Sequence, residues 1–267
     1  MTEYKLLQDG DPPPFRVEYP DAEGSIVVIC DHAGKNFPQA LGQLGIRDED
    51  REKHIAYDIG TEEVGICIGK KLDAKTYIAH YSRLVADVNR DPLRPDFAPS
   101  VSDGISVPGN KDLPKEQLQA RIDEIYTPYQ DAVGAGLQAF LDSGKVPFLL
   151  SVHSFTPHMN GQDRPWEIGI LWNEEDVAAP RLIEELRRNN PDLTIGDNVP
   201  YSLQMQGGRG FSNTVERQAK SRGVPSLVVE FRQDTVDTPE KARKMAEVFL
   251  ESFEIVMADK DLYRLTG

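Results

Sequence analysis

Two histidines, His32 and His153, each stand just after or at the end of a short apolar run. If the two runs are parallel strands, their carboxyl ends meet at one edge of a sheet and the histidines converge. Two histidines and one carboxylate form a common catalytic zinc site, which leaves one position open for water. A single histidine at a strand end is more often a hydrogen-bonded structural residue, but the pair favours a metal site. We therefore predict that His32 and His153 bind Zn²⁺ or another divalent metal.

The third ligand does not follow from a short motif. The close His-x-x-Glu spacing of many zinc peptidases is absent, because Ala33, Gly34 and Lys35 follow His32. Asp58 is the candidate, since it precedes a glycine turn and the start of a predicted helix. The alternative is that Asp58 only caps this helix.

Glu230 ends the most apolar predicted strand, residues 226–230. A carboxylate there is expensive to bury unless it has a partner or a chemical role. A bound metal lowers the pKa of its water to about 7. A neighbouring glutamate can then take the water's proton and pass it to a leaving amine. Glu230 is therefore the predicted catalytic residue, and the predicted chemistry is amide hydrolysis.

The adjacent residues Asn89 and Arg90 offer an amide and a planar guanidinium, which suit a substrate carboxylate. Arg90 could instead bridge Asp87 or Asp91. The sequence leaves this alternative open.

The net charge is −14, from 44 acidic and 30 basic residues. Such a surface repels phosphate backbones and anionic lipid, so we expect no nucleic-acid or membrane partner. A small anionic substrate then needs local arginines. Arg83 and Arg209 are further substrate-binding candidates, and the glycines around Arg209 fit either a closing loop or a plain flexible one.

Short apolar runs alternate with amphipathic stretches over most of the chain, which predicts an α/β fold with a mostly parallel sheet between helices. The predicted strands are 25–30, 75–79, 83–88, 146–152, 167–172 and 226–230. The predicted helices are 61–72, 114–141, 180–188, 213–221 and 239–257. Two long loops, 91–113 and 192–210, are expected to serve a site.

We expect a single catalytic domain over residues 25–267, preceded by an extended lead-in over 1–24. Cys30 and Cys67 lie in apolar stretches without a CxxC spacing and are expected to be core thiols. No apolar signal segment or long apolar run is present, so a cytoplasmic location is expected. A homodimer is expected from base rates alone.

Several segments together resemble the N-formylglutamate amidohydrolase family, in order and over roughly residues 25 to 260. The segments are 31–34 with Pro38, 57–60, 81–83, 87–90, 151–157, 164–166 and 230–234.

The resemblance implies a phosphorylase/hydrolase-like, zinc carboxypeptidase-like fold with a central mixed sheet. It also implies that Asn89 and Arg90 bind the substrate carboxylate and that Glu230 is the general base. The family's named activity, in histidine catabolism, releases formate from N-formylglutamate. The expected substrate is therefore a small anionic N-acyl amino acid. A related zinc deacylase or carboxypeptidase with another substrate, and a non-catalytic anion-binding relative, remain alternatives.

Overall fold

A computed structural model describes residues 4–159, 161–172, 177–201 and 212–266. These residues form one α/β domain around a seven-stranded sheet with the strand order β1-β3-β2-β6-β11-β9-β10. The strands of the sheet are β1 (Phe15–Glu18), β2 (Ile26–Cys30), β3 (Lys75–Ala79), β6 (Phe148–Phe155), β9 (Ile168–Leu171), β10 (Ile195–Asp197) and β11 (Ser226–Arg232). Two small hairpins pair β4 (Val101–Ser102) with β5 (Ile105–Ser106) and β7 (His158–Met159) with β8 (Gln162–Asp163).

The four central strands, β3, β2, β6 and β11, run parallel to one another. Strand β1 pairs antiparallel with β3, and β9 pairs antiparallel with β11 and parallel with β10. The predicted mixed, mostly parallel sheet is therefore confirmed. Because β9 runs against β11, the segment before β9 lies at the same edge as the carboxyl ends of the central strands.

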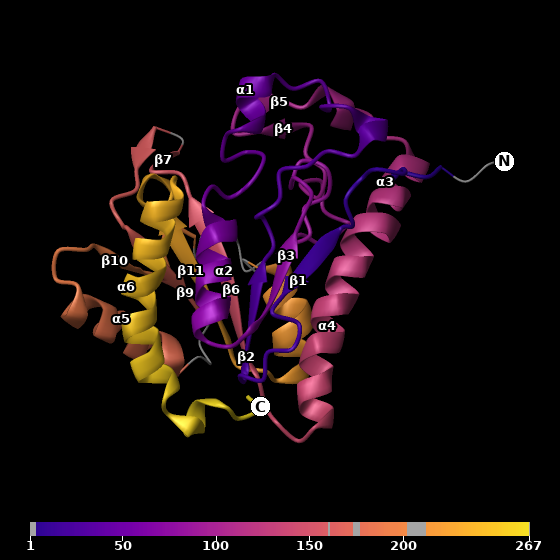
Figure 1. The fold of residues 1–267 in the computed structure, drawn as a ribbon. Helices are drawn as coiled ribbons and strands as arrows, with labels where there is room; N and C mark the ends of the chain where they lie inside the picture. Colours follow the sequence, from indigo (N-terminus) through magenta and orange to yellow (C-terminus); the bar gives the residue numbers. More distant parts are fainter. Residues whose placement is uncertain (1–3, 160, 173–176, 202–211, 267) are drawn as a thin grey trace.

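Helices cover both faces of the sheet, as Figure 1 shows. The helices are α1 (Asp48–Arg51), α2 (Thr61–Lys71), α3 (Lys115–Arg121), α4 (Thr127–Asp142), α5 (Ala178–Asn189) and α6 (Pro239–Met257). Val28, Leu150 and Val229 belong to the core formed with α2, α5 and α6. Their neighbours along the strands, such as Val27 and Leu149, pack instead toward α4, because successive strand residues point to opposite faces.

The strand predicted for residues 83–88 is wrong. This segment is a series of turns that begins at Ser82, where Val85 N donates to Ser82 O. Its carbonyls are bound by side chains rather than by a neighbouring strand. Asn110 Nδ2 donates to Leu84 O at 2.7 Å, and Arg121 Nη1 donates to Val85 O at 2.8 Å. The apolar run reflects burial of these turns and not a place in the sheet.

Two sheet strands lie where no strand was predicted. Strand β1 falls in the expected lead-in, and β10 falls in the expected loop 192–210. Both are short edge strands, and their burial pattern gives little alternation to detect.

The predicted helix 114–141 is α3 and α4 joined by a π-helical turn, Ile122–Tyr126. Pro128, just beyond this turn, has no amide hydrogen and cannot donate a helical hydrogen bond. The widened turn before it leaves out the bond that the proline could not form. The stretch predicted as a helix over 213–221 contains a second π-helical segment, Val215–Ala219. Within the described residues, no helix is both long enough and apolar enough to cross a membrane.

Candidate metal centre and active site

His32 lies in the turn directly after β2, at the carboxyl edge of the sheet. The turn packs closely against β3. A Cβ atom on Gly34 would lie 2.1 Å from the His80 backbone carbon, so only glycine permits this approach. The close packing fixes where the His32 side chain enters the site.

Asp58 lies on the loop that precedes α2, and its backbone N donates to His32 O at 2.8 Å. Gly60 then turns the chain with a φ of +80°, and a Cβ there would meet Val236 O at 2.1 Å. Helix α2 has no side-chain N-cap, so Asp58 is not a helix-capping residue in this structure. Its carboxylate points instead toward two histidines.

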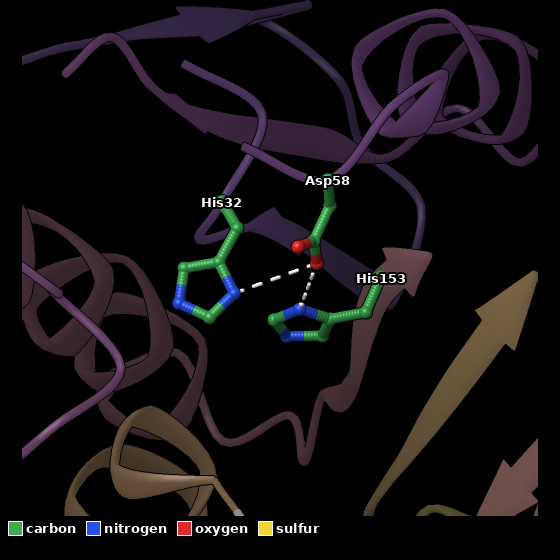
Figure 2. A group of neighbouring side chains, drawn as sticks. All are labelled: His32, Asp58 and His153. Carbon is green, nitrogen blue, oxygen red and sulfur yellow. Dashed lines mark hydrogen bonds and ion pairs between the residues drawn. The ribbon is translucent and has the colours of Figure 1, made fainter. Parts of the chain in front are cut away.

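The side chains of His32, Asp58 and His153 converge in a buried cluster (Figure 2). Their potential ligand atoms all lie within 4.8 Å of one another. Asp58 Oδ2 lies 2.8 Å from His153 Nδ1 and 3.4 Å from His32 Nδ1. The two imidazole rings meet edge to face, with centroids 4.9 Å apart. One carboxylate oxygen therefore faces the Nδ1 atoms of both histidines.

A second carboxylate lies at the outer nitrogen of each histidine. His32 Nε2 is 2.7 Å from Asp87 Oδ1, and His153 Nε2 is 3.7 Å from Asp31 Oδ2. Ser151 Oγ also lies 3.1 Å from His153 Nε2. Carboxylates in this position orient metal-binding histidines and set their tautomers.

The remaining contacts hold these outer carboxylates in place. Tyr129 OH donates to Asp31 Oδ1 at 2.6 Å, and Arg83 Nη2 donates to Asp87 Oδ2 at 2.9 Å. Arg83 Nη1 also lies 3.4 Å from Asp58 Oδ1. The carboxylates around the two histidines are thus tied to helix α4 and to the 83–88 turns.

The buried ionisable groups stabilise one another. Burial would raise the pKa of Asp58, but the nearby His32 charge and the His153 hydrogen bond hold it below its usual range. Burial would lower the pKa of His153, but the nearby carboxylates of Asp31 and Asp58 raise it to about 10. The cluster therefore favours a positive charge between its ligand atoms.

The three residues fit a divalent metal ion. Two imidazoles and one carboxylate are the donors of many catalytic zinc sites, and here all three are buried with their donor atoms converging. The outer carboxylates of Asp87 and Asp31 leave each Nδ1 directed at the centre of the cluster.

Glu230 lies beside this cluster because β11 and β6 pair in register, with Glu230 opposite His153. The side chain is only 6% exposed, and its Oε2 atom has no hydrogen-bond partner among the described residues. Burial raises the pKa of Glu230 to about 7. A carboxylate with a pKa near neutrality can both accept and return a proton.

A cavity of about 310 Å³ opens beside the cluster. It is lined by all four residues, by Asn89, Arg90 and Arg83, and by part of the predicted loop 91–113. Arg209 lies outside the described residues.

Asn89 is held with a defined orientation. Its Oδ1 accepts from Ser212 Oγ at 2.9 Å and from Thr214 N at 3.1 Å, so its NH₂ group remains available as a donor. Arg90 bridges neither Asp87 nor Asp91. It pairs with Asp96 at 3.3 Å and donates to the Asn89 carbonyl.

Sequence reasoning missed the roles of Asp31 and Asp87 at the outer nitrogens and of Tyr129, which holds Asp31 in place. A carboxylate next to a histidine at a strand end was a detectable signal for Asp31. No sequence signal indicated Tyr129, which lies 98 residues away from Asp31 on α4.

A sequence model described as N-formylglutamate amidohydrolase matches residues 24–236. No curated protein matches the chain. Among solved structures, the gene product Atu2144 from Agrobacterium tumefaciens is 27% identical, with a TM-score of 0.87 over 96% of this chain and 100% of that one. The N-formylglutamate amidohydrolase from Ralstonia eutropha JMP134 is 17% identical, with a TM-score of 0.62 over 94% of this chain and 99% of that one, and so shares the fold. The family match covers most of the sequence, and the chain therefore belongs to the N-formylglutamate amidohydrolase family.

Proposed function

We propose that this protein is a metal-dependent amide hydrolase that releases formate, or another small acyl group, from N-formylglutamate or a similar N-acyl amino acid. Zn²⁺ is the proposed metal, and His32, Asp58 and His153 are its proposed ligands. The family membership supports amidohydrolase activity. The substrate and the metal are the parts that we infer.

The observation that carries the proposal is the buried cluster of His32, Asp58 and His153 with Glu230 at its side. A divalent cation held there would supply Lewis acidity, lowering the pKa of a water molecule and polarising the amide carbonyl. Burying three ionisable groups together is costly unless they bind a charge or do chemistry.

Glu230 is the proposed proton carrier. Its Oε2, which has no hydrogen-bond partner within the described part of the chain, is available to take the proton of the attacking water. The same carboxyl group then gives that proton to the nitrogen of the departing amine as the C–N bond breaks. The products are a carboxylic acid, formate in the simplest case, and a free amino acid.

Asn89 and Arg90 are proposed to bind the substrate carboxylate. The Asn89 amide is oriented by Ser212 and Thr214, and Arg90 lines the same cavity. The Arg83 guanidinium is engaged with Asp87 and Asp58, so we assign to it mainly the orientation of those carboxylates. Substrate contacts of Arg83 and Arg209 stay predictions.

The test is to purify the protein, measure bound metals, and assay formate release from N-formylglutamate before and after chelation. We expect about one divalent ion per chain and loss of hydrolysis on chelation. Re-addition of Zn²⁺ should restore the rate. Acetyl and succinyl amino acids, assayed in parallel, identify the preferred acyl group.

A protein that binds no metal and hydrolyses none of these amides, but binds the anions tightly, would refute the proposal. That outcome would indicate a non-catalytic relative. Hydrolysis that is fast and insensitive to chelation would refute the metal requirement alone.

A further inference from the structure

Arg164 lies just before β9, in a segment with no role in the mechanism above. Its backbone N donates to Pro157 O at 2.8 Å, and Arg232 Nη1 donates to the next carbonyl, Pro165 O, at 2.9 Å. Because β9 runs antiparallel to β11, this segment lies at the edge of the sheet where Glu230 is found. The backbone of Arg164 is therefore fixed near the active site.

The Arg164 guanidinium is held among side chains that line the cavity. It lies over the Tyr201 ring at 4.9 Å and the Phe155 ring at 5.9 Å. Its Nη1 donates to Tyr201 OH at 3.1 Å, and its Nη2 lies 2.9 Å from Met159 Sδ. Tyr201, Phe155 and Met159 all line the cavity beside the metal cluster. Arg164 itself does not line the cavity, and its guanidinium lies directly behind the three side chains that form this part of the wall.

Arg164 forms no ion pair with any carboxylate in the part of the chain that the structure describes. Its contacts there are a phenol, a thioether and two aromatic rings. By contrast, Arg83 is paired with Asp87 and Arg90 with Asp96. In a protein with a net charge of −14, an arginine without a carboxylate partner beside the active site is suited to an anionic ligand.

Tyr201 both contacts Arg164 and lines the cavity beside the metal cluster. Its hydroxyl accepts a hydrogen bond from Arg164 and therefore keeps its own proton for donation. Burial, followed by the nearby charges of Glu230 and Asp58, raises the pKa of Tyr201. The hydroxyl therefore stays protonated at neutral pH. A carboxylate bound here would receive a hydrogen bond from the phenol and attraction from the guanidinium.

We propose that Arg164 and Tyr201 together bind the side-chain carboxylate of the substrate and so select acidic N-acyl amino acids. This inference rests on the proposed function and assigns specificity to residues that it leaves unused. Asn89 and Arg90 would bind one carboxylate of the substrate, and Arg164 with Tyr201 the other.

The experiment compares N-formylglutamate with N-formylglutamine, which has nearly the same shape but a neutral side chain. In the wild-type enzyme the acidic substrate should be preferred. Arg164→Met keeps an apolar stem and removes the charge. It should lower kcat/KM for N-formylglutamate on the order of 10- to 100-fold and change that for N-formylglutamine by less than about 3-fold.

Arg164→Lys, which keeps the charge without the planar fork, should recover part of the preference, and Tyr201→Phe should lose part of it. Arg217→Met is the matched control, because Arg217 also lies over a tyrosine ring, that of Tyr126 at 5.8 Å, but this tyrosine does not line the cavity. It should leave both substrates unaffected. Metal content should be the same in all variants.

If Arg164→Met slows both substrates equally, or neither, the specificity assignment is wrong while the proposed function stands. If the wild type hydrolyses neither substrate, the proposed function fails, and calorimetric binding of glutarate then tests the anion site. Binding that weakens at least 10-fold in Arg164→Met would support the site on its own. Binding that is absent or unaffected by the substitution would overturn it.

Discussion

Glu230 and His153 occupy paired positions on the parallel strands β11 and β6, and their side chains leave the same face of the sheet next to each other. Both residues are buried. The spacing between the proposed proton carrier and a proposed metal ligand is thus set by backbone hydrogen bonds between two central strands. Sites built on such elements hold their geometry more closely than sites built on loops.

Glu230 is proposed to carry a proton and not to bind the metal, and this predicts the effect of Glu230→Gln. Glutamine keeps the shape of the side chain but cannot accept and return a proton, so kcat should fall by about 10²- to 10⁴-fold. Metal content should not change, because Glu230 is not part of the ligand cluster. Formate release and atomic absorption measure the two quantities.

Glu251→Gln on the exposed side of α6 is the control and should behave as wild type. A Glu230→Gln enzyme with nearly normal turnover would contradict the assignment of the base.

Asp87→Asn tests the outer carboxylate of His32. The substitution removes the charged acceptor 2.7 Å from His32 Nε2 and the partner of Arg83. Metal affinity should fall about 10- to 100-fold, as is usual when the carboxylate behind a ligating histidine is lost. Competition with a chromophoric chelator measures it.

The exposed neighbour Asp91, changed to Asn, should leave metal affinity unchanged. Equal affinities of the Asp87→Asn variant and the wild type would show that Asp87 does not orient His32.

The convergence of His32, His153 and Glu230 could be predicted from the sequence because each ends or follows a long apolar strand of the central sheet. Parallel strands bring their carboxyl ends to one edge whatever the loops do. The burial of these strands gives a clear pattern, and the fold class follows from it.

Arg164 could not be found in this way. The parallel strands present their carboxyl ends at this edge, whereas β9 runs antiparallel to β11 and brings its amino-terminal flank there. Strand direction depends on long-range pairing with β11 and leaves no local pattern in the sequence. The strand prediction for 83–88 was wrong for the same reason, because pairing depends on long-range contacts. The carbonyls of these turns bind distant side chains instead of a strand.

Those turns carry Arg83 and Asp87, and Asn110 should be essential to their structure. Its Nδ2 donates to Leu84 O at 2.7 Å and Pro99 O at 3.0 Å, while its Oδ1 accepts from the buried Arg121 at 2.7 Å. Asn110→Ala removes the side-chain donor of both carbonyls and one of the two acceptors of Arg121 Nη1, which keeps only Val85 O. The free energy of unfolding should fall by about 3 kcal/mol or more, since each unsatisfied buried group costs roughly 1–3 kcal/mol.

Urea denaturation measures this loss, and Gln138→Ala on the exposed face of α4 is a control expected to stay within about 0.5 kcal/mol of wild type. Metal affinity should also fall in the Asn110 variant, because Asp87 moves with the turns. A variant as stable as the control would show that water replaces the lost side chain.

His80 should make the protein less stable in weak acid. Its Nε2 lies 3.0 Å from Arg16 Nη1, which can only donate, so Nε2 must accept and Nδ1 must donate to Pro13 O at 2.8 Å. The contact with Arg16 requires the neutral ring, whereas Nδ1 can still donate to Pro13 O when the ring is protonated. Burial first, and then the Arg16 charge, lower the pKa of His80 below its ordinary value of 6.5.

A histidine with a lowered pKa in the folded state contributes stability above its ordinary pKa and loses it as the pH falls through the folded pKa. We therefore expect the free energy of unfolding to decline from about pH 7 to about pH 5. His80→Gln should flatten that decline, whereas His158→Gln on the exposed β7–β8 hairpin should not. Hydrogen exchange should show β1 opening first, because Arg16 belongs to that strand. Parallel stability curves for the wild type and His80→Gln would show that another group causes the acid sensitivity.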